Sequence, residues 1–396
     1  MSSKEPSFAP DAFAPARLGP IAVRNRIVKA ATFEGVTPEH VVTEELIDFH
    51  RRISKGGAGL TTVAFCAVSE DGCGTPNEII LTNDVVPGLR RLAEAIHAEG
   101  AAVSAQIGHA GAVATAIGER GLSPSPIFSP RTLRRTRAAS EHDISRIIGD
   151  FAHGARIIAD GGFDAVEIHL GHGYLPSEFL SPRLNRRRDG WGGSLENRAR
   201  FPREIARAVR EAAGDRIAVT AKLNMMDGVS GGLGLDESLE VARRLETDGA
   251  VDAIELTGGS SLENPMFLFR GEPPIAEMAA LMRQPFRFAF RLLGKRFLRE
   301  YPYEEAYFLP LARRFRDALK MPLILLGGVN RLATIRQAMA EGFDFVAMGR
   351  ALLREPDLVN KLRAGASTEA SCIHCNKCVP TIYGGTHCVL EPRPTL

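Results

Sequence analysis

The chain has 396 residues, of which 44% are hydrophobic and 24% are charged, as in an ordinary soluble globular protein. Its net charge of +2 argues against a general nucleic-acid-binding protein, which would be more basic. No apolar run approaches the roughly 18 residues of a membrane span, which excludes a transmembrane segment. Residues 1–20 contain no apolar core of a secretory signal, so we expect a cytoplasmic protein.

Eight short apolar runs recur along the chain, with helical stretches between them. In chain order they cover residues 23–31, 59–65, 102–108, 164–170, 217–223, 252–258, 322–328 and 344–350. The intervening stretches 86–100 and 237–249 have a helical pattern and end on Gly, the usual residue just past a helix C-terminus. Strands that alternate with helices predict parallel βα units, and eight units predict a closed (β/α)8 TIM barrel. A doubly wound open sheet, the competing fold, would carry a Gly-rich fingerprint after the first strand, and none follows residues 23–31.

Two insertions and a tail lie outside these eight units. Residues 111–145 are expected to form a loop. The insertion after the sixth strand, 261–321, carries a cationic stripe at Arg283, Arg287, Arg291, Lys295 and Arg299 and an apolar stripe at Phe286, Phe290, Leu293 and Phe297. We expect a helix packed on the barrel with a solvated basic face; a lid over the active site, a partner surface and contact with a membrane surface are the alternatives. The predicted domains are a barrel at 1–370 and a cysteine-rich tail at 371–396.

The fourth strand ends in a group of side chains suited to catalysis. His169 ends the strand, and His172 and Tyr174 follow in the loop, at the strand end where TIM barrels place catalytic groups. Two imidazoles three residues apart can donate hydrogen bonds to one oxygen atom, and a nearby phenol can supply a proton. This set suits polarising a carbonyl group and protonating the neighbouring carbon. Histidines with a purely structural role are the alternative.

Other strand ends carry groups that could hold a cofactor. Gln106 follows the third strand, and its amide can donate and accept at once, as the edge of a heterocycle requires. Lys222 follows the fifth strand and supplies a cation. For both, a helix-facing polar group is the alternative. A phosphate site after strands seven and eight needs backbone N–H groups and a guanidinium, which are offered by Gly327, Gly328, Gly349 and Arg350.

Five stretches match, in order, the motifs of a known family. They are "RNRIVKAA", "GGAGL", "AQIGHAG", "GFDAVEIHLGHGYLPSEFLSPRLNRRRDGWGGSLENRARF" and "MGRALLREPDLVNKL". Through them the chain resembles the Old Yellow Enzyme group of flavin oxidoreductases over about residues 8–390. The resemblance implies a TIM barrel with non-covalent FMN at its C-terminal mouth.

The same resemblance implies a reaction and roles for the strand-four residues. NAD(P)H reduces the flavin, whose N5 then passes hydride to the β-carbon of an electron-poor alkene, such as an enone or an enoyl thioester. His169 and His172 bind the carbonyl oxygen of this unsaturated substrate, and Tyr174 donates a proton to the α-carbon.

The resemblance also implies a set of flavin contacts. Gln106 contacts the pyrimidine edge, and Thr32 or Phe33 stands beside the flavin N5, with the choice between the two left open. Lys222 and Phe65 depart from the usual pattern, which has Arg and a small residue at these positions. The full expected cofactor set is Ala31, Thr32, Gln106, Lys222, Gly327, Gly328, Gly349 and Arg350.

The tail resembles a stretch that ligates a [4Fe-4S] cluster in 2,4-dienoyl-CoA reductase and trimethylamine dehydrogenase relatives. Its four cysteines, spaced C-x2-C-x2-C-x9-C, are Cys372, Cys375, Cys378 and Cys388. Four thiolates suit an Fe–S cluster or tetrahedral zinc, and metal-free thiols are a third reading. In those relatives an FAD-binding domain follows. The alternative function is therefore a barrel that exchanges electrons, through this cluster, with a separate protein. Further copies of the chain are also candidate partners.

Overall fold

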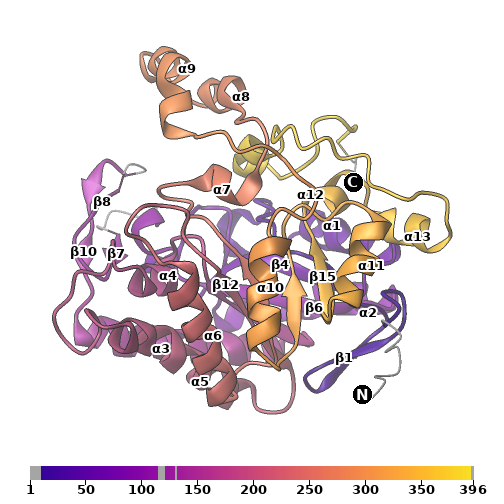
Figure 1. Cartoon of the computed structure of the whole chain (residues 1–396), viewed down its shortest axis with the longest axis horizontal. Coiled ribbons are helices and arrows are strands. Elements are labelled where there is room, and N and C mark those ends of the chain that lie inside the picture. The colour runs from indigo at the N-terminus through magenta and orange to yellow at the C-terminus, as the bar shows by residue number, and fades with distance from the viewer. Residues whose placement is uncertain (1–9, 115–120, 130–131, 394–396) are drawn as a thin grey trace, which may run out of the picture.

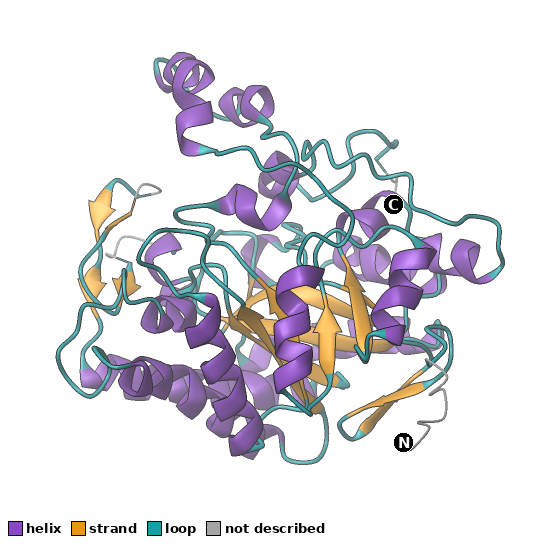
Figure 2. Ribbon diagram, in the orientation of Figure 1, coloured by secondary structure: helices purple, strands orange, loops and turns teal. Residues whose placement is uncertain are grey.

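A ring of eight parallel strands forms the centre of the molecule, a computed structural model that describes residues 10–114, 121–129 and 132–393 (Figures 1 and 2). The hydrogen-bonded order is β3-β15-β14-β13-β12-β11-β6-β4, and β3 also pairs with β4, which closes the ring. The strands are β3 (Ile27–Lys29), β4 (Leu60–Ala67), β6 (Ala102–Gly108), β11 (Ala165–Leu170), β12 (Ala218–Asn224), β13 (Ala253–Thr257), β14 (Leu323–Leu325) and β15 (Phe345–Met348). The predicted TIM barrel and its eight strands are confirmed.

Helices surround the strands (Figure 2). The outer ring consists of α1 (Glu44–Lys55), α2 (Val86–Ala98), α3 (Glu141–Asp160), α5 (Leu195–Ala213), α6 (Leu235–Asp248), α10 (Leu309–Ala318), α11 (Leu332–Ala340) and α12 (Arg350–Arg354). The helices predicted at 86–100 and 237–249 correspond to α2 and α6. Gly249 follows α6 in the left-handed conformation (φ 64°), which a side chain would disfavour.

The barrel interior is apolar at one end and charged at the other. At the N-terminal end, Leu18, Val28, Leu60, Ile324 and Phe345 fill it, covered by the hairpin of β1 (Ala16–Leu18) and β2 (Ile21–Val23). Further along the strands the inward positions become polar. Every second side chain of a strand faces the barrel interior, so one strand can present an apolar residue near its start and a polar residue near its end. The inward-facing polar residues therefore place the site at the C-terminal end of the barrel.

The first insertion differs from the predicted loop. Within its described part it contains four short strands, β7 (Leu122–Ser123), β8 (Phe128–Ser129), β9 (Arg134–Arg135) and β10 (Arg137–Ala138), and α3 already begins at Glu141. The prediction failed because two-residue ladders leave no alternating pattern. Residues 115–120 and 130–131, which belong to this predicted loop, lie outside the described residues. The same holds for residues 1–9, where we expected no secretory signal, and for residues 394–396 of the predicted tail.

The part of the second insertion that carries the two stripes does not pack on the barrel as predicted. The insertion contains α7 (Pro265–Phe269), α8 (Ile275–Ala280) and α9 (Phe286–Phe297), and α8 and α9 form a hairpin that projects from the body (Figure 1). The expected helix is present, but its apolar stripe faces outward, with Phe286 and Phe297 both about two-thirds exposed.

The tail lies over the C-terminal end of the barrel. It follows the short helix α13 (Leu358–Arg363) and contains a 3-10 turn, η5 (Val379–Tyr383). The backbone N–H of Thr386 donates to the carbonyl of Glu34 (2.7 Å), which ties the tail to the loop after β3. Across the described ranges, no helix has the length and apolar character to cross a bilayer.

Candidate active site

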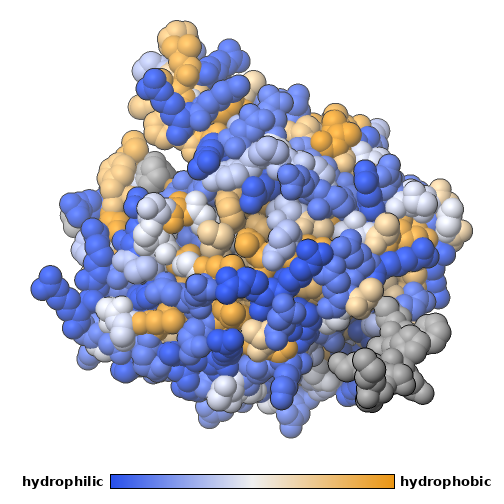
Figure 3. Space-filling model, in the orientation of Figure 1, coloured by the Kyte–Doolittle hydropathy of each residue, from blue (hydrophilic) through white to orange (hydrophobic). Residues whose placement is uncertain are grey.

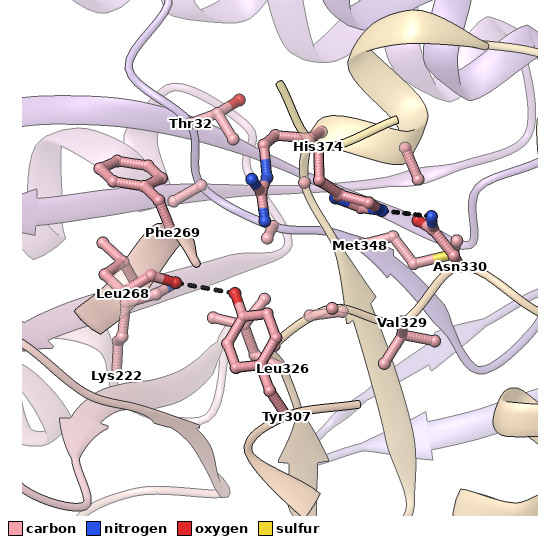
Figure 4. Close-up of a pocket in the computed structure, with 18 of the residues that line it drawn as sticks. Thr32, Lys222, Leu268, Phe269, Tyr307, Leu326, Val329, Asn330, Met348 and His374 are labelled. Carbon is pink, nitrogen blue, oxygen red and sulfur yellow. Dashed lines mark hydrogen bonds between the residues drawn. The ribbon is translucent and has the colours of Figure 1, made fainter. Parts of the chain in front are cut away.

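A cavity opens at the C-terminal ends of the barrel strands (Figure 4). Loops after β3, β14 and β15 form one side of it, and Lys222 of β12 and His172 lie at the other. The residues that line it are Ala30, Ala31, Thr32, His172, Lys222, Leu268, Phe269, Tyr307, Leu326, Gly327, Gly328, Val329, Asn330, Ala347, Met348, Gly349, Arg350, Ala351 and His374. Seven of the eight predicted cofactor residues are therefore brought together around one space.

The predicted phosphate residues form one end of the cavity. Gly327 and Gly328 follow β14, and Gly349 and Arg350 follow β15. A Cβ atom on Gly328 would lie 2.6 Å from the ring of Tyr307, so only glycine brings this backbone so close to the ring. The Arg350 guanidinium is held by the side-chain oxygen of Asn376 and the carbonyl of Arg270. The result is a fixed cation beside glycine backbone.

Thr32 supplies an unused polar atom to the cavity. Its Oγ1 is buried and has no hydrogen-bond partner among the described residues. Phe33 instead packs with Ala64 and Phe65 away from the lining. Of the two residues, Thr32 lines the cavity and Phe33 does not, and the choice between them beside the flavin N5 stays a prediction.

Lys222 is a buried cation between two carboxylates. Its Nζ lies 2.9 Å from Oε1 of Glu167 and 2.5 Å from Oε1 of Glu255. Burial by itself would lower the pKa of Lys222, but the two carboxylates outweigh it and raise the pKa. Burial raises the pKa of Glu255 to about 7, with Lys222 opposing the rise and Glu167 adding to it. The cavity wall thus presents a permanent positive charge.

Gln106 is the predicted cofactor residue that does not line the cavity. It donates to Oε1 of Glu167 (2.7 Å), the carboxylate that also binds Lys222. It therefore belongs to the same polar network as Lys222, and its contact with a flavin edge remains a prediction.

His169 and His172 form a hydrogen-bonded pair at the end of β11. Nε2 of His169 lies 3.2 Å from Nδ1 of His172, and Nε2 of His172 lies 2.8 Å from Oγ1 of Thr257. The backbone N–H of Gly171 donates to Nδ1 of His169 (3.2 Å). His169 therefore carries its proton on Nε2, which makes Nδ1 of His172 an acceptor and its Nε2–H a donor to Thr257.

Both imidazoles are neutral near pH 7. Burial, followed by the positive charges of neighbouring groups, holds the pKa of His169 well below its usual value and lowers that of His172 to about 3. A neutral imidazole can donate one hydrogen bond without bringing a positive charge.

Tyr174 completes the group predicted from sequence. Its ring centroid lies 4.7 Å from that of His169 in an edge contact and 5.2 Å from that of Phe65 in a stacked arrangement. His172 lines the cavity, and His169 and Tyr174 lie behind it, within one cluster of rings. The predicted catalytic set is therefore assembled in space.

The four tail cysteines line one small cavity of their own. Burial raises the pKa of the Cys378 thiol to about 11, and each of the other three thiols adds to the rise. No group of three or more His, Cys, Asp or Glu side chains within residues 10–114, 121–129 and 132–393 is arranged to hold a single metal ion. The thiols thus face a common space without converging on one point.

Arg350 and His374 line both cavities and separate the thiols from the proposed phosphate end. The amide of Asn330 donates to Nε2 of His374 (2.5 Å), as Figure 4 shows, and Nδ1 of His374 lies 4.0 Å from Sγ of Cys372. His374 also stacks on Tyr303, with 3.6 Å between ring centroids. His374 is therefore part of the wall between the two cavities.

Sequence reasoning missed four groups that support this site. Glu167 and Glu255 could have been found, because each lies two residues before an inward-facing polar residue of its own strand, His169 and Thr257. Asn330 and His374 carried no such signal, since their positions depend on how the tail crosses the barrel.

Comparison with known proteins identifies the family. The family model for the NADH:flavin oxidoreductase / NADH oxidase family matches residues 11–256. The chain belongs to this family. The expected Old Yellow Enzyme-like relationship is therefore confirmed, and the protein is a flavin-dependent oxidoreductase that uses FMN and NAD(P)H.

Members of the family differ in length and in the substrates they are named for. A 4,4'-dithiodibutanoate disulfide reductase of Rhodococcus erythropolis is 53% identical over 384 residues, which cover 96% of this chain and 95% of that protein. A multifunctional alkene reductase/demethylase of Caballeronia cordobensis is 32% identical over 92% of this chain but only 50% of its own length. A solved 2-naphthoyl-CoA reductase complex matches with a TM-score of 0.82 and 27% identity, over 96% of this chain and 57% of that one.

Proposed function

We propose that this family member reduces the electron-poor C=C bond of an enone or enoyl thioester. When bound, FMN supplies the redox chemistry, taking a hydride from NAD(P)H and passing one to the substrate. The observation that carries the proposal is the cluster of two neutral imidazoles and a phenol beside a cavity with a fixed cation at each end. The alkene reductase of Caballeronia cordobensis supports the same chemistry.

The residues of the cavity fit FMN by their donor chemistry. Arg350 and the glycine backbone of the loops after β14 and β15 suit its phosphate. Lys222 suits the ring edge that gains negative charge, because its own charge is secured by two carboxylates. The unpartnered hydroxyl of Thr32 suits a polar atom of the ring.

The substrate roles follow from the donor chain at β11. When the carbonyl oxygen binds, the Nε2–H of His172 turns to it from Thr257 and the Nε2–H of His169 turns to it from His172. Both imidazoles then orient this oxygen and stabilise negative charge there as the double bond is reduced. Tyr174 gives its proton to the α-carbon, while the hydride joins the β-carbon. Hydride and proton together saturate the bond.

A small organic disulfide is the second candidate acceptor. The Rhodococcus erythropolis relative, which matches this chain over nearly its full length, is named for the disulfide of 4,4'-dithiodibutanoate. In that reaction a hydride and a proton convert one disulfide into two thiols: the S–S bond breaks, one sulfur receives the hydride and the other leaves as thiolate. Tyr174 would then protonate the leaving thiolate.

An anaerobic experiment separates the two acceptors. The FMN-loaded protein is reduced with NADH or NADPH and mixed with 2-cyclohexenone or with 4,4'-dithiodibutanoate, and flavin reoxidation is followed by absorbance. Faster reoxidation by the enone supports the first candidate, and faster reoxidation by the disulfide assigns the second. Failure of both compounds to reoxidise the flavin contradicts the proposed function.

We also propose that Cys372, Cys375, Cys378 and Cys388 ligate a [4Fe-4S] cluster that exchanges electrons with a separate protein. In such a cluster each of four irons takes one thiolate, so the four thiols need to face one cavity. The shared wall of Arg350 and His374, which puts this cavity next to the flavin site, supports an electron-transfer role. Iron and acid-labile sulfide in near-equal amounts in the purified protein test this proposal, and zinc in their place contradicts it.

A further inference from the structure

The hairpin of α8 and α9 exposes large apolar side chains at the most projecting part of the molecule. Figure 3 shows hydrophobic and hydrophilic residues intermixed on this projection. We call the apolar residues the hairpin surface: Leu281, Phe286, Phe288, Leu292, Leu293 and Phe297, with exposed fractions of 54%, 64%, 64%, 67%, 41% and 66%. Such a concentration of exposed apolar groups on a soluble fold marks an interaction site.

The hairpin surface is not needed for packing within the fold. α9 contacts α8 at Gly294, where a Cβ would lie 3.0 Å from Ile275. Phe286, Leu293 and Phe297 follow helical spacing and share one side of α9. Phe288 and Leu292 lie on another side, so apolar groups face outward in two directions.

The charge around the hairpin surface is mostly positive, because the nearest acids in sequence, Glu277 of α8 and Glu300, lie at its two edges. Between Met278 and Arg299 the sequence has six cations and no acidic residue: Arg283, Arg287, Arg291, Lys295, Arg296 and Arg299. None of the six forms an ion pair with any described residue. Arg287 donates to the carbonyls of Ala280, the last residue of α8, and of Met282, and Arg299 lies over the ring of Tyr301. The others have no counter-charge in the described parts of the chain.

We propose that the hairpin surface binds the interface of an anionic lipid bilayer. A helix with Phe and Leu on its apolar positions and Lys and Arg between them inserts its apolar groups at the headgroup boundary, where anionic lipids attract the cations. A second copy is disfavoured as the occupant, because two hairpins would bring twelve cations together, while Glu277 of α8 is already paired with Lys377.

The attachment would orient the barrel. α7 lies between the hairpin and the barrel (Figure 1), and Leu268 and Phe269, at its end, line the flavin cavity. A bilayer bound at the hairpin therefore lies on the side of the molecule where the cavity opens. This binding does not depend on the proposed substrate.

Vesicle co-sedimentation of the FMN-loaded full chain tests the proposal. Wild type is expected to sediment with vesicles of equal phosphatidylcholine and phosphatidylglycerol, but not with pure phosphatidylcholine, and to be released by high salt. Replacement of three cations in R291Q/K295Q/R296Q should lower partitioning by about 100-fold, since each cation near the surface contributes about 1 kcal/mol. Loss of the apolar groups in F286S/L293S/F297S should also abolish sedimentation.

Matched variants control for general changes in surface chemistry. K320Q/R336Q/R363Q removes three exposed cations elsewhere, and F128S/L133S removes two exposed apolar side chains of the first insertion. Both should bind as wild type does, and flavin absorbance confirms that every variant is folded. Three results overturn the proposal: wild type that ignores anionic vesicles, hairpin variants that bind as well as wild type, or a wild-type oligomer that the hairpin variants dissociate in the absence of lipid.

Discussion

Nε2 of His169 lies 3.2 Å from Nδ1 of His172, and the groups on either side fix which atom donates. The N–H of Gly171 occupies Nδ1 of His169, so the chain of donation runs from His169 to His172 and on to Oγ1 of Thr257. A substrate oxygen must therefore compete with an acceptor that is already in place. Thr257 becomes a positioning residue for His172.

Replacement of Thr257 by Val should strengthen ligand binding and lower the stability of the fold. The Nε2–H of His172 loses its acceptor and becomes available, so the Kd for an unsaturated carbonyl ligand should fall by up to about tenfold, the worth of one net hydrogen bond. The free energy of unfolding should fall by about 1–3 kcal/mol, because a buried donor loses its partner. Ligand titration and denaturant unfolding measure the two effects.

Thr220→Val is the matched control, since Thr220 lies on the adjacent strand deeper in the barrel and its hydroxyl donates to Val166 (3.4 Å). It should leave the Kd unchanged. Equal ligand affinities for wild type and Thr257→Val would mean that Thr257 does not restrain His172.

Tyr174→Phe should slow only the step that needs a proton. The ring contacts with Phe65 and His169 survive the change, so reduction of the flavin by NAD(P)H should keep its rate. Reoxidation by the enone should slow by about 100-fold or more, the usual contribution of a positioned general acid. Stopped-flow absorbance resolves the two half-reactions. Tyr383→Phe, at an exposed tyrosine, should change neither, and unchanged reoxidation in Tyr174→Phe would remove Tyr174 from the reaction.

The low pKa of His172 sets a direction for stability against pH. Its folded pKa is about 3, below the ordinary value of about 6.5, so the unfolded chain binds a proton first as the pH falls. Above about pH 6.5 the contribution of neutral His172 to the free energy of unfolding is fully present. It is lost as the pH falls toward 3, at up to about 1.4 kcal/mol per pH unit. His172→Gln should lower the slope of the unfolding free energy between about pH 6 and pH 4 by that amount.

Urea unfolding of both proteins across this range measures the slope. Identical slopes for wild type and His172→Gln would show that His172 is not buried in its neutral form.

The free energy of unfolding should depend more on the positive charge of residue 222 than on the shape of its side chain. Lys222→Met leaves Glu167 and Glu255 facing one another in the barrel without a cation, and should cost about 3–5 kcal/mol of unfolding free energy. Lys222→Arg keeps the charge and should recover most of this loss. A Met variant as stable as the Arg variant would show that the two carboxylates are not both ionised beside Lys222.

Removal of one tail thiol should prevent binding of the whole proposed cluster. Cys378→Ser should remove iron and sulfide from the purified protein while FMN remains bound, because the phosphate end keeps Arg350 and its glycine loops. Cys73→Ser is the control, since Cys73 is buried far along the chain from the tail and its thiol donates to Thr75. Iron content that is equal in wild type and Cys378→Ser would exclude this cysteine as a ligand.

The sequence was sufficient to predict the barrel because its strands are buried on both sides. Such strands read as apolar runs bounded by Gly, and a polar residue at a strand end, such as His169 or Lys222, stands out against them. The residues proposed for the phosphate could be singled out for the same reason, since Gly328 and Arg350 lie three and two residues past the ends of β14 and β15 and line the cavity.

Features that depend on contacts between distant segments could not be predicted. The outward direction of the Phe286 stripe depends on α9 packing against α8 alone, whereas the amphipathic pattern fits packing on the barrel equally well. The role of His374 depends on Asn330 and Tyr303, which lie far from it in sequence. Gln106 lies within β6, donates to Glu167 and is not among the residues that line the cavity, which the sequence alone could not show.

The most direct test of the central claim is an anaerobic spectrum of the freshly purified protein during one catalytic cycle. The account predicts the two visible bands of an oxidised flavin, their loss on addition of NADH or NADPH, and their return on addition of an enone or an organic disulfide. A colourless protein that cannot be reconstituted with FMN, or a reduced flavin that neither acceptor reoxidises, would contradict it.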